Sequence, residues 1–169
     1  MFRMVAILFE LAVLVCALWA LSFLSTVLHE FGHALGYMLA TGDTHWHIRV
    51  GWGKRLLNVK ALTVNLLVFD GLFSPAEGRI DTKAKLIMML SGGPIISLVL
   101  VVALLLLRFS GAPFYSDAIA QSAIVFFINT ALFINGAILL LSILPVHYFW
   151  GEVKGMESDG LQIIHAMKA

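Results

Sequence analysis

The chain has 169 residues, of which 60% are hydrophobic and 12% are charged. An ordinary soluble domain carries about 25% charged residues, so this composition excludes that class and predicts an integral membrane protein. The length fits one polytopic domain over residues 1–169, without room for a separate soluble module. The single cysteine, Cys16, excludes a disulfide framework within the chain and a metal site built from several thiolates.

Three apolar stretches, at about residues 4–41, 86–107 and 118–146, stand out along the chain. Each is long enough to cross a hydrocarbon core of about 30 Å, which takes roughly 20 helical residues. The first would form a helix about 57 Å long at 1.5 Å per residue, so we expect it to tilt or to protrude. Gly42 and Asp43 are typical of the end of a helix.

The N-terminus has a second interpretation, a cleaved signal peptide. Arg3 precedes an apolar run, which is part of the signal-peptide pattern. Glu10 lies inside that run and no break precedes the histidines that follow, so we expect a retained helix instead.

The distribution of lysine and arginine predicts the orientation of the spans. Residues 43–85 hold seven lysines and arginines. The N-terminus offers only Arg3, and the connection between the second and third stretches offers only Arg108. Positive residues stay in the cytoplasm, so the first connection and the C-terminus should lie inside and the N-terminus outside. We expect this basic segment to face lipid headgroups rather than nucleic acid. Its basic residues are Arg49, Lys54, Arg55, Lys60, Arg79, Lys83 and Lys85.

The segment between the first and second spans predicts a different local structure. Residues 44–69 are rich in Val, Thr, Ile and Leu around the sequence GWGK, a pattern that indicates a β-hairpin. Gly71, Pro75 and Gly78 then predict a loop. The predicted fold class is therefore an all-α membrane protein, with about three transmembrane helices and a membrane-associated β-hairpin between the first and the second.

The stretch LHEFGHALG, residues 28–36, places three ionisable side chains inside the first apolar span. On a helix, His29 and His33 are one turn apart and point the same way. Two imidazoles at this spacing can bind one zinc ion, and Glu30 is near enough to accept a proton from the water that the metal activates. Each ionisable group near mid-membrane costs roughly 2.5–3.5 kcal/mol, so three together favour a bound metal over a chance match or satisfied core histidines.

A zinc ion needs a third protein ligand, because a catalytic site leaves only the fourth position for water. The histidine pair lies near the cytoplasmic end of its span, so we expect the ligand to come from another cytoplasmic segment. Asp159 is a short carboxylate between a small and a flexible residue, and His147 is the alternative. The other candidates are His45, His47, Glu152, Glu157 and His165.

The order of these motifs resembles the site-2 protease family of zinc intramembrane metalloproteases, over residues 5–164. Members have HExxH on a membrane helix, a membrane-associated hairpin, a helix with a Gly-Pro motif, and an N-x-x-P segment before an Asp-Gly pair. This chain has HEFGH, HIRVGWGK, SGGPIIS, and SILP followed by ESDG. The resemblance implies that His29, His33 and Asp159 bind one zinc ion per chain and that Glu30 is the general base.

The resemblance also implies where a substrate would bind. It assigns Gly93, Pro94, Ser97 and Ser142 to substrate binding, although the family often has asparagine where this chain has the two serines. The gap before the Asp-Gly pair is also longer than the common spacing. An unwound substrate strand could add to the edge of the hairpin, because exposed sheet edges accept extended peptides.

The implied function is a zinc-dependent endopeptidase that cleaves transmembrane or membrane-adjacent segments of membrane proteins or signal-peptide-like substrates. The expected location is the lipid bilayer of a bacterial inner membrane, with the active site toward the cytoplasm. The sequence predicts no nucleic-acid partner and leaves the substrate and the oligomeric state open. The alternative is a proteolytically inactive scaffold, chaperone or zinc-handling protein of the same fold, which would have no use for Glu30.

Overall fold

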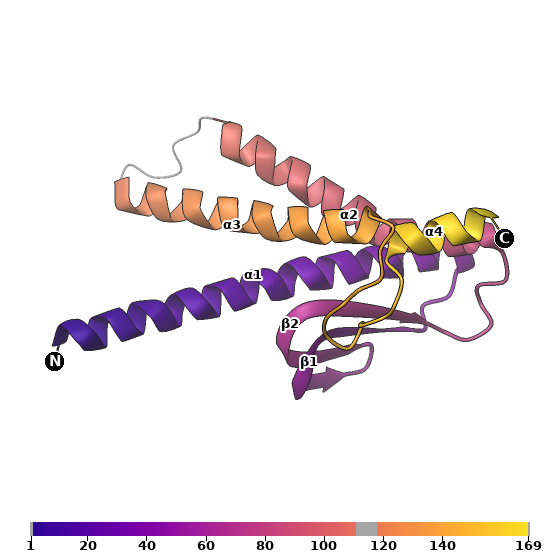
Figure 1. Ribbon diagram of the computed structural model, residues 1–169, viewed down its shortest axis with the longest axis horizontal. Coiled ribbons are helices and arrows are strands. Elements are labelled where there is room, and N and C mark those ends of the chain that lie inside the picture. The colour runs from indigo at the N-terminus through magenta and orange to yellow at the C-terminus, as the bar shows by residue number, and fades with distance from the viewer. Residues whose placement is uncertain (1, 111–117, 169) are drawn as a thin grey trace.

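The computed structural model of the protein describes residues 2–110 and 118–168. One long helix runs most of the length of the molecule, and the hairpin and the short last helix lie near its C-terminal end (Figure 1). The elements are, in chain order, α1 (Phe2–Thr41), β1 (Trp46–Val59), β2 (Leu62–Pro75), α2 (Lys83–Phe109), α3 (Ala118–Ile143) and α4 (Asp159–Lys168).

Three of these helices, α1, α2 and α3, are long and apolar enough to cross a membrane, judged by length and composition. They coincide with the predicted spans except at the ends. α3 ends at Ile143, earlier than the predicted Val146, because Pro145 disfavours helical backbone at the residue before it. α4 adds ten residues of helix to the predicted elements, too few to span a hydrocarbon core.

Glycines allow α1 and α2 to approach closely. A side chain at Gly32 would collide with the backbone of Gly92, and a side chain at Gly36 would collide with the backbone of Met88. Small residues four positions apart serve the same purpose at other helix contacts in membranes. The contact fixes the second half of α1, which bears the histidines, against the first half of α2.

β1 and β2 pair antiparallel, with register shifts that fold the hairpin back on itself. Each residue of Ile48–Val50 has two partners, one within residues 62–64 and one within residues 71–73. The hairpin therefore continues past its predicted end, and the predicted loop at Gly71 is wrong. Gly71 lies in this strand next to α1. Any larger residue at this position would collide with the carboxylate of Glu30.

The hairpin lies against α1. Its buried residues share an apolar core with Ala34 of α1, and the Trp19 indole donates a hydrogen bond to the Leu66 carbonyl, at 2.7 Å. Burial of these side chains is the main force that holds the hairpin beside the helix. The buried hairpin residues are Ile48, Val50, Val64 and Val68.

The segment between α3 and α4, residues 144–158, is called the α3–α4 loop. Its two ends are tied together, because the Ser158 hydroxyl donates to the Leu144 carbonyl at 2.6 Å and the Ser158 amide donates to the Val146 carbonyl at 2.9 Å. From there the loop descends to the hairpin and returns to α4 (Figure 1). At its far end the Glu152 amide donates to Asp70 Oδ2 of β2, at 3.0 Å.

Candidate metal centre

His29, His33 and Asp159 meet where α1, α2 and α4 pack together. The two imidazole Nε2 atoms are 3.3 Å apart, and Asp159 Oδ2 lies 3.5 Å from that of His29 and 3.4 Å from that of His33. The ligand atoms of a tetrahedral zinc ion, with bonds of about 2.0–2.1 Å, lie about 3.3 Å apart. Among the described residues, this is the one group of three or more metal-ligating side chains close enough to hold an ion.

The other nitrogen of each imidazole has its own partner. His33 Nδ1 lies 3.0 Å from the Met89 carbonyl, which can only accept, so Nδ1 donates there and Nε2 faces the triad, where it binds a metal only in its deprotonated form. His29 Nδ1 lies 2.8 Å from the Ser97 hydroxyl, whose oxygen can accept a hydrogen bond from Nδ1 in the same way. Such partners orient metal-ligating histidines and fix the tautomer that binds.

Asp159 is positioned by the first turn of α4. A side chain at Gly160 would collide with the Ile143 backbone, so this glycine lets α4 begin directly against the end of α3. Burial raises the pKa of the Asp159 carboxyl, but the charges and hydrogen bonds of His33 and His29 outweigh it and lower the pKa to about 2. The carboxylate is therefore ionised at neutral pH, as a metal ligand must be.

Glu30 lies beside the triad without belonging to it. It is only 6% exposed, and it lines the same two cavities as its neighbour His29. Gly71 of β2 leaves the space that the Glu30 side chain occupies. The structure thus brings together three side chains that could hold a metal ion and places one further buried carboxylate, Glu30, beside them.

The other candidate third ligands form contacts outside the triad. His147 is 60% exposed at its side chain and lies 3.9 Å from Glu157, which also pairs with His165 at 3.1 Å. His45 pairs with Asp43, His47 bonds to Thr63 and Glu152 pairs with Arg49.

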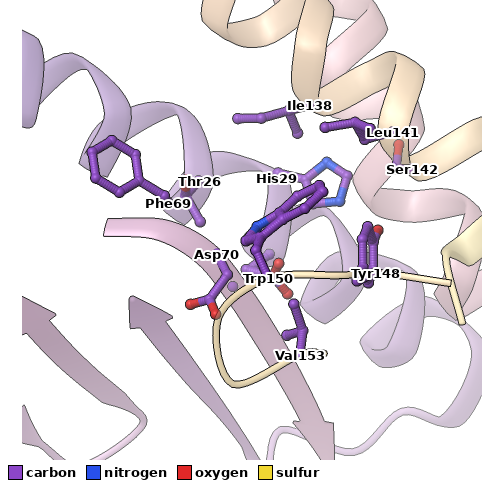
Figure 2. A pocket seen from close by; sticks show the side chains of 12 residues that line it. Thr26, His29, Phe69, Asp70, Ile138, Leu141, Ser142, Tyr148, Trp150 and Val153 are labelled. Atoms are coloured by element: carbon purple, nitrogen blue, oxygen red, sulfur yellow. The ribbon is translucent and has the colours of Figure 1, made fainter. Parts of the chain in front are cut away.

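Two cavities adjoin the triad. The first, called the α3 cavity, has a volume of about 90 Å³ and lies between α3, β2 and the α3–α4 loop (Figure 2). The second, called the α4 cavity, has a volume of about 240 Å³ and includes His33, Asp159 and the end of β2. His29 and Glu30 line both. The two cavities therefore adjoin each other at these residues of α1.

The four residues predicted to contact substrate lie in different surroundings. Gly93 packs against the imidazoles of His33 and His29, where a side chain would collide with them. Pro94 lies inside α2 and lines a separate hollow toward α4. Ser97 is fully buried behind His29. Of the four, Ser142 alone lines one of the two cavities at the triad, and its substrate role stays a prediction.

Ser97 and Ser142 offer a matched test of the site. We expect Ser97→Ala to lower zinc affinity about 10–100-fold, because His29 loses the partner that orients its ring. Ser142→Ala should leave zinc affinity unchanged, because that hydroxyl donates to the Leu139 carbonyl of its own helix. Competition with a fluorescent zinc chelator measures both, and equal losses would contradict the assigned role of Ser97.

Comparison of the chain with family models, with curated proteins and with solved structures found no match for any of the three.

Proposed function

We propose that the protein is a zinc-dependent endopeptidase that cleaves transmembrane or membrane-adjacent segments of other proteins. The main support is the buried triad of His29, His33 and Asp159, spaced for a tetrahedral ion, with Glu30 beside it. A structural zinc site usually has four protein ligands, whereas a catalytic site has three and an open position. The three long apolar helices support a location within a membrane.

The proposed mechanism assigns one proton transfer in each direction to Glu30. A zinc ion in the triad would supply Lewis-acid polarisation of the scissile carbonyl and make water a nucleophile near neutral pH. Glu30 accepts a proton from the attacking water while the water oxygen bonds to the carbonyl carbon. When the carbon–nitrogen bond breaks, Glu30 gives this proton to the leaving amine, and the carboxylate is restored.

The edge of β2 offers a place for the substrate backbone. A helical substrate hides its carbonyls in hydrogen bonds, so it must be extended where it is cut. Residues 71–73 and Pro75 line the α4 cavity together with Glu30, His33 and Asp159. We expect an extended substrate to pair with this edge, since strand addition supplies main-chain hydrogen bonds without requiring one particular sequence.

The proposal can be tested with purified protein in detergent and a panel of fluorescently tagged single-span proteins. We expect one zinc ion per chain and cleavage of at least one panel member. Cleavage should stop when 1,10-phenanthroline removes the metal and should return when zinc is restored. Full zinc occupancy without cleavage of any member would reject the proposal and favour an inactive zinc-binding protein of the same fold.

A further inference from the structure

Tyr148 of the α3–α4 loop lies at the centre of the candidate site. It is one of five residues that line both the α3 cavity and the α4 cavity, the others being His29, Glu30, Gly71 and Val153. A peptide that crosses from one cavity to the other would therefore pass Tyr148 at the triad.

The loop backbone fixes the position of Tyr148. Its amide donates to the Met156 carbonyl at 2.9 Å, and its carbonyl accepts from the Gly155 amide at 2.7 Å. The ring packs edge-on against Trp150, with centroids 5.6 Å apart. The Asp70–Glu152 hydrogen bond holds the far end of the loop, so the segment that carries Tyr148 is fixed at its base and at its far end.

The Tyr148 hydroxyl is available as a donor. Within residues 2–110 and 118–168 no hydrogen-bond partner is found for it. It points toward the side of the α3 cavity where His29 and Ser142 lie (Figure 2). A tyrosine hydroxyl has an ordinary pKa of about 10, well above neutral pH. The group keeps its proton and can donate it in a hydrogen bond.

Most other polar groups of the α3 cavity cannot take this role. The hydroxyls of Ser142 and Thr26 donate to backbone carbonyls, at 3.0 Å and 3.4 Å. Asp70 is an acceptor when ionised. Trp150 has an indole donor, but it does not line the α4 cavity, which contains His33 and Asp159. Of these groups, Tyr148 is thus the donor that lines both cavities, which a spanning substrate would occupy.

We propose that Tyr148 is a catalytic residue whose hydroxyl donates a hydrogen bond to the scissile carbonyl oxygen as negative charge develops on it. This inference rests on the proposed peptidase function. Donors aimed at a developing oxyanion stabilise the transition state more than the ground state, so they raise kcat and have little effect on KM. Tyr148 would supply the donor that the serines at 97 and 142 do not.

The test is Tyr148→Phe, which removes the hydroxyl and keeps the ring. We expect kcat on a cleaved panel substrate to fall about 10²-fold, the usual effect of losing one oxyanion donor, with KM and zinc content unchanged. Binding of a phosphinic peptide, a tetrahedral mimic of the transition state, should weaken by a similar factor in calorimetry. This binding measurement reports on the hydroxyl independently of turnover.

Two further variants make the outcome decisive. Tyr37→Phe removes the hydroxyl of a buried tyrosine that bonds to Asp43 outside the cavities, and it should keep both kcat and phosphinate affinity. Unchanged kcat in Tyr148→Phe, or a loss confined to Trp150→Phe, would overturn the assignment to Tyr148. A zinc-loaded wild type that cleaves no substrate would reject the proposed function itself, and with it this inference.

Discussion

Replacing Glu30 with glutamine should slow peptide cleavage sharply while zinc stays bound. The amide keeps the size of the side chain but cannot accept a proton from water or return it to the leaving amine. General acid–base groups contribute about 10²–10⁴-fold to rate, so kcat should fall within that range. Zinc per chain, measured by elemental analysis after gel filtration, should match wild type, because Glu30 is not one of the three ligands.

Glu10→Gln is the matched control on the same helix. Glu10 lies on an exposed part of α1, about 30 Å from Glu30 along the helix at 1.5 Å per residue. Neutralising it should leave both cleavage and zinc content unchanged. A Glu30→Gln protein that cleaves as fast as Glu10→Gln would show that Glu30 is not the general base.

Replacing Asp159 with alanine should abolish both zinc binding and activity. The variant leaves two imidazoles, and it removes the one ligand that brings a negative charge to the ion. A ligand that binds only the folded state stabilises it by about 2.7 kcal/mol at a concentration 100 times its Kd. Wild type should therefore unfold at a higher temperature when zinc is added, and Asp159→Ala should show no such shift.

Glu157→Gln separates this effect from a general loss of charge near α4. Glu157 pairs with His165 and His147 but lies outside the triad, so its neutralisation should preserve the zinc-dependent shift. Retention of the shift in Asp159→Ala would contradict the assigned ligand. A combined Asp159→Ala and His147→Ala variant would then show whether His147 had replaced it.

The helices of this fold could be predicted from the sequence more completely than the hairpin. Uninterrupted apolar stretches determine the helices, because backbone groups in a membrane must be paired within the segment. The hairpin extends further than the local pattern indicates: Gly71 pairs with Val50 in β2 and, lacking a side chain, leaves room for the Glu30 carboxylate of α1. That contact joins residues far apart in the chain, so a local turn signal at Gly71 gave the wrong boundary.

The candidate site shows the same division between local and distant information. The spacing of His29 and His33 is a local property of one helix turn, and it indicated a metal pair directly. Predicting Asp159 as the third ligand required the order of motifs along the whole chain, since no local pattern links this residue to α1. The partner of His29, Ser97, was assigned to substrate binding, because the sequence cannot show that its hydroxyl faces the ring.

Tyr148 and Asp70 were missed as parts of the site. Tyr148 stands in a run of aromatic residues, a pattern that is typical of a membrane interface and hides a single ring that points into a cavity. Asp70 is a charged residue within a strand of apolar residues, and this isolation was the signal that could have identified it. Its buried carboxylate accepts a hydrogen bond from the Glu152 amide at the far end of the α3–α4 loop.

Because α4 begins directly against the end of α3, the position of one candidate ligand depends on a different helix from that of the other two. His29 and His33 move with α1, whereas Asp159 follows Ile143 through Gly160 and the ties of Ser158. A displacement of α3 relative to α1 would therefore change the distances between the carboxylate and the imidazoles. Metal retention in this protein would then depend on how α3 packs beside α1 as well as on the three side chains themselves.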